Sequence, residues 1–286
     1  MLNEKKKKRA IRLKLGIVPS ILILTLFVVV GTFADFLAPH DPIEIDLASS
    51  LLPPFWQESG TTTYLLGTDI LGRDILSRLI HGAKVSLVVA VFAILTSGII
   101  GGALGVIAGY NGGMVDAIIS RTVDTMMGFP TILLALVLAI VLGASVFNVI
   151  FIVVLIYWAR YARQVRGETL KIREMDYVTL ARTAGVSDLT IMWRHILPNV
   201  MSSVIVLATF NLGTVITLES SLSFLGAGVP PPTPSWGGMC SAGRDSLVSA
   251  WWVSFMPGLA ITLVVLSGNL FGDWLRDKLD PKLRGF

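Results

Sequence analysis

Long apolar stretches alternate with short polar segments along the whole chain. A helix needs about 20 apolar residues to cross a bilayer, so each stretch is long enough to span a membrane. The longest one, with 35 residues, is too long for one crossing at about 1.5 Å per residue, and the turn-forming residues 142–145 divide it into two. The pattern therefore predicts an all-α membrane protein with six transmembrane helices. The stretches without Asp, Glu, Lys or Arg are residues 15–34, 85–115, 125–159, 195–218 and 246–272.

Glycines in one of these stretches predict close helix packing, and a proline in another predicts a kink. Gly101, Gly105 and Gly109 recur at every fourth residue, a spacing that lets helix backbones approach closely in lipid. We therefore expect this face to pack against another helix. Phe129–Pro130 lies near the start of the divided stretch, where proline is expected to kink the helix. A kinked helix can line a path, which makes Phe129 a candidate pore-lining residue; a kink that serves only packing is an equally good interpretation.

The polar segment 39–83 is rich in proline and is expected to form an external loop. Apolar residues in its last part, from Leu71 to Ile80, recur at helical spacing, which predicts a short amphipathic helix lying along the membrane. Asp74 and Arg78 are four residues apart and are expected to pair on the polar face of that helix. A role in orienting the start of the second span is favoured over contact with a ligand.

The distribution of basic residues predicts the orientation. With the amino terminus inside, 19 of the 23 lysines and arginines fall on the cytoplasmic side and 4 outside, which is the bias that orients membrane proteins. We therefore expect both termini to be cytoplasmic, with a basic tail at 1–14 and a second tail at 273–286. Residues 15–38 are expected to be a retained first span, because a signal peptide would have a shorter apolar core. Arg121 and Asp124 are expected to pair at the membrane edge.

The composition of the chain argues against several kinds of binding and catalytic site. Hydrophobic residues make up 53% and charged residues 15% of the chain, whereas soluble domains carry about 25% charged residues. The single cysteine, Cys240, excludes a disulfide framework, and the three histidines show no metal-ligand spacing. No G-x-x-x-x-G-K-[ST] phosphate loop is present in the sequence, so if ATP drives this protein another chain binds it. We expect no catalytic residue, cofactor, metal or nucleic acid on this chain.

Two other classes of membrane protein fit the sequence less well. A secondary transporter usually needs ionisable groups near mid-membrane for ion coupling, and the central thirds of these spans have almost none. A membrane-embedded enzyme needs a nucleophile with its base or a metal cluster, and neither is visible.

The most informative polar segment is Asp176–Asn199, DYVTLARTAGVSDLTIMWRHILPN. Gly185 predicts the end of one helix, because glycine accepts the left-handed conformation found there. Ser187 is expected to cap a second helix, and Asp188 suits its first turn. Pro198 is expected to end or kink that second helix. One face of it is apolar, and is formed by Leu189, Met192, Trp193, Ile196 and Leu197.

This helix–turn–helix segment resembles the cytoplasmic coupling loop of ABC-type importer permeases. The family's signature is Glu-Ala-Ala, three residues, Gly, and nine residues before an Ile-x-Leu-Pro ending. Gly185 and Leu197–Pro198 stand at that spacing, whereas the first three positions are Thr179, Leu180 and Ala181, of which Ala181 alone matches, and His195 stands where Ile is usual. The alternative interpretation is an amphipathic hairpin lying passively on the lipid surface.

The resemblance implies a type I permease architecture, with a basic cytoplasmic tail, a first span, and a five-helix core at 84–272. That core contains the coupling loop at 168–198 and an external loop at 227–250. In the family the coupling loop docks into a groove on a partner ATPase. The residues that the resemblance assigns to this contact are Asp176, Tyr177, Thr179, Leu180, Ala181, Arg182, Gly185, Asp188 and Leu189.

Other motifs indicate which group of importer permeases the chain resembles. The runs Leu66–Asp69 and Leu71–Asp74, the proline-rich 228–237 and the ending GDWLRDKLDPKL look like the peptide and nickel group of these permeases. Residues 51–58 and 249–252 look more like dipeptide than nickel permeases, and a nickel or metal-chelate permease is the alternative. Asn211 and Glu219 in the fifth span join Phe129 as candidate pore-lining residues, although a solvated Glu219 at the membrane edge is equally plausible.

The resemblance also implies partners and a location. They are a second, homologous permease subunit, one or two ATP-binding subunits that hold ATP and Mg²⁺, and an extracytoplasmic solute-binding protein. The expected location is the inner or plasma membrane of a bacterium or archaeon, with the chain in contact with lipid.

Overall fold

The computed structural model describes the backbone of residues 2–279 and the side chains of residues 17–279. Helices dominate this part of the chain, in which β structure amounts to one isolated bridge between Thr68 and Asp74. In chain order the helices are α1 (Leu2–Thr32), α2 (Ala34–Leu37), η1 (Leu47–Ser49), α3 (Ile75–Asn111), α4 (Gly113–Gly128), α5 (Thr131–Leu142), α6 (Val146–Ile172), α7 (Asp176–Thr183), α8 (Asp188–Ile191), the π-helical turn η2 (Met192–Ile196), α9 (Leu197–Phe224), α10 (Trp236–Ala242), η3 (Arg244–Ser246) and α11 (Trp252–Leu279).

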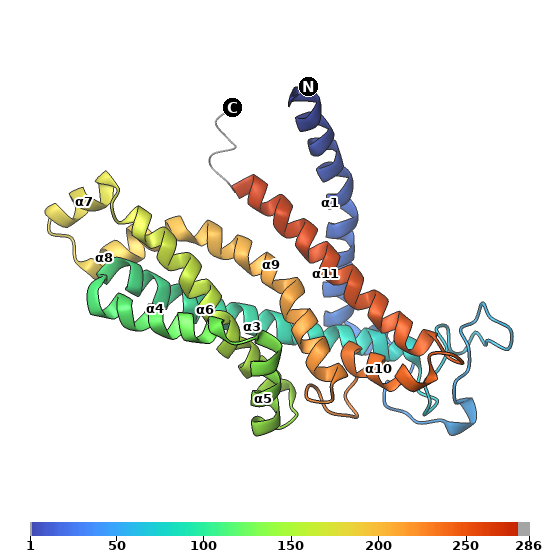
Figure 1. Ribbon diagram of the computed structural model, residues 1–286. Helices are drawn as coiled ribbons and strands as arrows, with labels where there is room; N and C mark the ends of the chain where they lie inside the picture. The colour runs from blue at the N-terminus through green and yellow to red at the C-terminus, as the bar shows by residue number, and fades with distance from the viewer. Residues whose placement is uncertain (1, 280–286) are drawn as a thin grey trace.

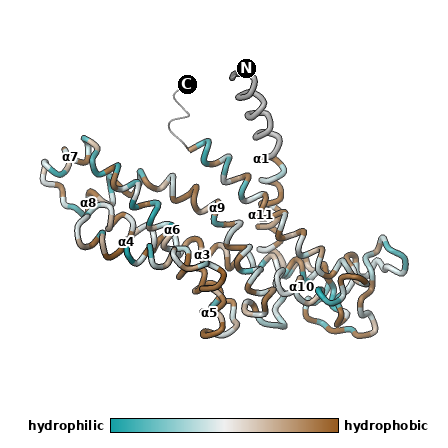
Figure 2. Tube along the Cα trace, viewed as in Figure 1, coloured by the Kyte–Doolittle hydropathy of each residue, from teal (hydrophilic) through white to brown (hydrophobic). Residues whose placement is uncertain are grey.

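The body of the molecule is elongated, with its polar connections at its two ends (Figure 1). Helices α3, α6 and α9 pack together, α11 packs on α9, and α1 packs on α11 and α3. Helices α7 and α8 lie at one end, at the left of Figure 1. The segment before α3 and helix α10 lie at the opposite end, where the external loops are expected. Hydrophobic residues concentrate on the helices between these ends (Figure 2).

Four helices are long and apolar enough to cross a membrane: α3, α6, the continuous stretch Asp188–Phe224, and α11. Helices α4 and α5 pass the same test together but are bent by 91° at residues 129–130, so the kink expected at Phe129–Pro130 is a complete break. The described apolar part of α1 is Ile17–Thr32. These findings agree with a multi-span, all-α protein, whereas six spans and cytoplasmic termini stay predictions.

The turn predicted at 142–145 is confirmed by backbone geometry. Gly143, which has a φ of +82°, ends α5, and the Ser145 side chain accepts a hydrogen bond from the Phe147 amide to start α6. The divided apolar stretch is therefore two helices, as expected. Gly112 and Gly113, with φ of +66° and +53°, form the turn between α3 and α4.

The glycine-rich face of α3 packs against α6, as its spacing predicts. A Cβ added at Gly105 would lie 2.7 Å from the Ala162 carbonyl oxygen and 2.8 Å from Val165 Cβ. Gly109 is equally close to Thr169, at 2.7 Å from its Cβ. Larger residues on this face would therefore push the two helices apart.

Three local expectations are corrected. The region around Leu71 forms no separate amphipathic helix, because Asp74 caps α3, which then runs unbroken from Ile75. As the cap, Asp74 accepts hydrogen bonds from the Ser77 amide at 2.9 Å and the Ser77 hydroxyl at 2.6 Å rather than pairing with Arg78.

The expected pair within α4 is also replaced. Asp124 binds Arg163 of α6 at 2.5 Å instead of Arg121. Its carboxylate therefore joins two helices instead of stabilising one.

Candidate functional site

The segment 176–199 forms a compact hairpin whose turn depends on Gly185. Its φ is +79°. The Gly185 amide donates to the Arg182 carbonyl and the Val186 amide to the Ala181 carbonyl, both at 3.1 Å. This pair of bonds is the Schellman arrangement, which satisfies the last carbonyls of a helix. The predicted role of Gly185 as a helix stop is therefore confirmed.

The second helix of the hairpin starts at the predicted residue, with a different local contact. Ser187 occupies the N-cap position, and its hydroxyl contacts the Thr190 hydroxyl at 2.8 Å instead of capping a backbone amide. Asp188 lies in the first turn, where a negative charge suits the helix dipole.

A separate hydrophobic cluster holds the hairpin to the body of the protein. Val178 of α7 and Ile191 of α8 are both fully buried. They belong to a cluster that also contains Val106 of α3 and Val165 of α6. The hairpin is therefore anchored to two long helices and not only to the segments that precede and follow it in the chain.

Tyr110 at the end of α3 adds a polar anchor. Its hydroxyl donates to Asp188 Oδ1 at 2.5 Å, and the Arg182 guanidinium lies 5.4 Å from its ring centroid. One tyrosine thus touches both helices of the hairpin. This role could not be predicted from the sequence, since Tyr110 lies 66 residues before Asp176 in the chain and no local pattern connects the two.

The predicted coupling residues cover the outside of the hairpin. Ala181 is half-buried and the other eight are exposed. Leu180 and Leu189, with 68% and 64% of their surface exposed, are apolar residues presented to the surroundings by an otherwise polar element. Such residues favour an interface.

The second helix of the hairpin continues directly into α9. Residues 192–196 form a π-helical turn, after which α9 runs to Phe224. Pro198 lies in the first turn of α9 and does not end the helix, which corrects one of the two expectations for it. A proline cannot donate to the carbonyl four residues back, and the π turn just before it is the kind of local adjustment that such a position needs.

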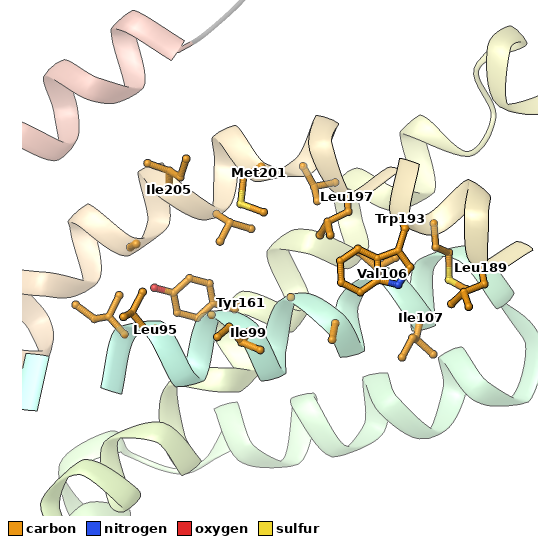
Figure 3. A pocket seen from close by; sticks show the side chains of 18 residues that line it. Leu95, Ile99, Val106, Ile107, Tyr161, Leu189, Trp193, Leu197, Met201 and Ile205 are labelled. Carbon is orange, nitrogen blue, oxygen red and sulfur yellow. The ribbon is translucent and has the colours of Figure 1, made fainter. Parts of the chain in front are cut away.

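An apolar groove of about 530 Å³ lies between α3 and α9, with Tyr161 of α6 between them (Figure 3). The residues of the apolar face predicted for the second hairpin helix lie in two different surroundings. Ile196 is buried in the cluster, whereas Leu189, Trp193 and Leu197 line the groove.

The three candidate pore-lining residues are not brought together. Glu219 is fully buried: its carboxylate accepts from Ser223 Oγ at 2.9 Å and from Ser86 Oγ of α3 at 3.1 Å. The interpretation of Glu219 as a solvated residue at the membrane edge is therefore wrong. Asn211 is also buried, and Phe129 is 55% exposed at the break between α4 and α5. Whether any of the three lines a path stays a prediction.

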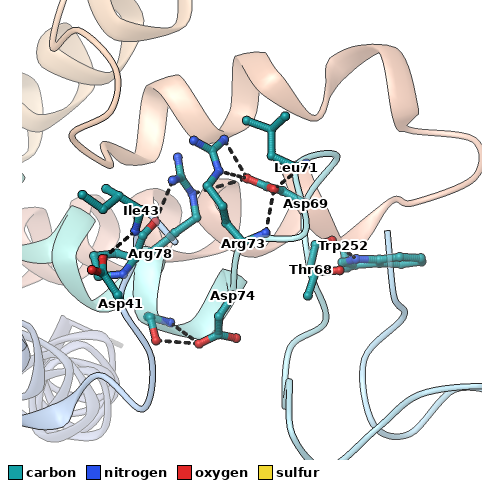
Figure 4. A network of polar contacts seen from close by, with 11 residues as sticks. Asp41, Ile43, Thr68, Asp69, Leu71, Arg73, Asp74, Arg78 and Trp252 are labelled. Atoms are coloured by element: carbon teal, nitrogen blue, oxygen red, sulfur yellow. Dashed lines mark hydrogen bonds and ion pairs between the residues drawn. The ribbon is translucent and has the colours of Figure 1, made fainter. Parts of the chain in front are cut away.

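The opposite end of the molecule is fixed by a network around Asp69 (Figure 4). Its carboxylate accepts from the Leu71 amide at 2.9 Å and pairs with Arg73 at 2.7 Å and Arg78 at 3.6 Å. Trp252 Nε1 of α11 donates to the Thr68 carbonyl at 3.2 Å. These contacts order the segment before α3, which agrees with the structural role expected for it.

The comparisons with known proteins agree with this architecture. Residues 101–285 match the family described as the inner membrane component of binding-protein-dependent transport systems. The chain is 42% identical to a di/tripeptide transport system permease protein of Pseudomonas aeruginosa, over 94% of this chain and 89% of that protein. It is 39% identical to a dipeptide transport system permease protein of Haemophilus influenzae, over 94% and 91%, and 42% identical to a glutathione transport system permease protein of Escherichia coli, over 92% and 86%.

Family and structure together define the class. The chain is a multi-pass inner-membrane protein, since several apolar helices of spanning length accompany the family match. It therefore belongs to the family of inner membrane components of binding-protein-dependent transport systems, the permease subunits of ABC importers.

Proposed function

We propose that this chain forms one half of a translocation path for di- and oligopeptides, and that a second, homologous permease subunit forms the other half. One or two ATP-binding subunits hold ATP and Mg²⁺ and carry out hydrolysis, and an extracytoplasmic solute-binding protein delivers the peptide. The names of the relatives, which include di/tripeptide, dipeptide and glutathione permeases, support this substrate class.

The hairpin 176–199 is the proposed contact with the ATPase. One observation carries this proposal: Asp188–Phe224 forms a continuous helical stretch, so an exposed docking element and a spanning helix are one unit. A movement of the ATPase that displaces the hairpin would therefore displace α9. The buried cluster extends the same movement to α3 and α6.

The transport cycle follows from this connection. ATP binding draws the ATPases together, the hairpins follow, and the permease helices exchange between two rigid-body arrangements. Hydrolysis then resets the system. No bond is made or broken by this chain, whose work is to couple the two movements.

Transport in reconstituted vesicles tests the proposal. The permease pair, the ATPases and the solute-binding protein are assembled together, and uptake of a labelled dipeptide is measured with and without ATP. We expect ATP-dependent uptake that requires the binding protein. Uptake of nickel or a metal chelate that excess dipeptide does not inhibit would instead identify the alternative substrate.

A further inference from the structure

A second groove, of about 590 Å³, opens between α6, α9 and the end of α11. Its volume lies in the range of roughly 300–1,000 Å³ that is usual for small-molecule sites. Asn199, Ser202, Ser203, Val206, Leu207 and Phe210 are the residues that α9 contributes. These positions recur at i, i+3, i+4, i+7, i+8 and i+11, which is one face of a helix.

This face of α9 lies opposite the one that lines the apolar groove. The apolar groove is lined from α9 by Leu197, Met201, Val204 and Ile205. At about 100° per residue, the mean direction of these side chains is close to 180° from that of the six residues that line the second groove, which we call the polar groove. The face of α9 toward α3 is therefore apolar, whereas the face toward α6 and α11 combines Asn199, Ser202 and Ser203 with Val206, Leu207 and Phe210. A helix face that meets only lipid has no need of Asn and Ser side chains.

The polar groove holds charges of both signs. Glu168 of α6 receives hydrogen bonds from Ser203 Oγ at 2.5 Å and Gln164 Nε2 at 3.0 Å, both on Oε1. Its Oε2 accepts no bond from the residues that the structure describes. Lys171 and Arg276 line the same groove, and within residues 17–279 neither makes an ion pair. One acidic and two basic residues thus line a shared space.

We propose that this groove binds the transported peptide on the cytoplasmic half of its path. Glu168 Oε2 accepts the α-ammonium group, Lys171 and Arg276 attract the α-carboxylate, and the Ser and Asn side chains face the amide groups. Val206 and Phe210 supply an apolar floor for side chains. The proposal deepens the function proposed above and rests on it.

Other occupants fit less well. From Asn199 to Phe210 the groove extends 11 residues along α9, about 16 Å, and Asn199 is the one lining residue that belongs to the hairpin proposed to contact the ATPase. The headgroup of an anionic lipid would meet the cations but would be repelled by Glu168. A short zwitterionic peptide uses both signs of charge and the polar wall.

Neighbouring residues on α9 provide a matched test. Val206 lines the polar groove and Ile205 lines the apolar groove, so the two lie at the same depth on different faces. Each is replaced by cysteine in a Cys240→Ala background, in the complete complex within inside-out vesicles. A water-soluble maleimide is applied with and without L-alanyl-L-alanine. We expect Val206→Cys to be labelled and protected several-fold by the dipeptide, and Ile205→Cys to show no protection.

The charge of Glu168 is tested in the same background. In Val206→Cys, adding Glu168→Gln should raise the dipeptide concentration for half-protection by about tenfold or more, since a hydrogen bond between charged groups is lost. Glu174→Gln is the control, because Glu174 pairs with Arg173 and does not line the groove. N-acetylated dialanine, which has no ammonium group, should protect weakly and be insensitive to Glu168→Gln.

The outcomes separate the two proposals. ATP-dependent dipeptide uptake by the Cys240→Ala complex is measured in parallel. If uptake is normal but dialanine protects neither cysteine, the groove proposal is overturned and the proposed function stands. Protection of Val206→Cys by ATPase binding alone would likewise assign the groove to the ATPase. Absence of uptake in an intact complex would overturn both.

Discussion

Substitution of Gly185 tests the hairpin most directly. Its φ is +79°, and a Cβ added there would meet no atom within 4 Å, so Gly185→Val creates strain without a clash. The strain is about 1–2 kcal/mol, a small part of the roughly 5–15 kcal/mol that stabilises a typical fold. The chain should therefore stay folded and inserted. The same strain lowers the population of the native turn by a factor of about 5–30, which displaces the second helix and its exposed Leu189.

The assay is co-purification of the ATPase together with peptide-stimulated hydrolysis, and we expect both to fall in Gly185→Val. Gly185→Asn should retain most of each, because asparagine tolerates the left-handed conformation. Gly167→Ala is the matched control: a Cβ at Gly167 also meets nothing within 4 Å, and its place inside α6 carries no such strain. Normal ATPase association, hydrolysis and transport in Gly185→Val would refute the coupling role and leave a passive surface hairpin.

Three further outcomes are expected. Gly105→Leu should prevent stable packing of α3 on α6, whereas Gly102→Leu should be tolerated, because a Cβ at Gly102 meets no atom within 4 Å; thermal stability of the purified protein in detergent compares them. Tyr110→Phe removes a hydrogen bond to a carboxylate, worth about 1.5–3 kcal/mol, and should weaken ATPase co-purification and raise amide exchange in the hairpin without loss of expression. Single cysteines at Ser187 and at the fully exposed Val248, in a cysteine-free background, should be labelled from opposite sides of the membrane; labelling of both from outside intact cells would contradict the six-span topology.

Local signals predicted much of the fold. The glycine at 185, the turn at 142–145 and the glycine face of α3 depend on backbone conformation or helical spacing, and both can be read from neighbouring residues. Each has the predicted geometry. The hairpin residues were found because a polar segment of that length between apolar spans is unusual, and because its spacing resembles a known loop.

Contacts between distant segments were not predictable in the same way. Spacing alone suggested that Asp74 pairs with Arg78, but this requires both to lie within one helix, and α3 begins only at Ile75. Burial of Glu219 depends on Ser86, which lies 133 residues earlier in the chain. A carboxylate near the end of a span gives no sign in the sequence of whether serines or water will surround it.

The polar groove was missed for a related reason. Glu168 is the first residue of the predicted coupling loop 168–198, and none of its neighbours in the chain marks it as part of a groove. The serines of α9 are too short and neutral to interrupt an apolar stretch. Only the packing of α6 beside α9 brings the Glu168 carboxylate to Ser203. A hydropathy pattern records how polar a segment is on average, and it does not record which face of the helix carries the polar residues.

The continuity from hairpin to span would explain how the proposed docking element can move a membrane domain. Ile191 is the last residue of α8 and Ile196 is the last residue of the π-helical turn η2. Both are fully buried in the cluster with α3 and α6. A force on the hairpin is therefore expected to act on three helices together. At the other end of the same stretch, Glu219 joins α9 to α3 through Ser86. Because α9 is held to α3 at both ends, the two helices are expected to move as one body, and the polar face of α9 toward α6 and α11 would move with them.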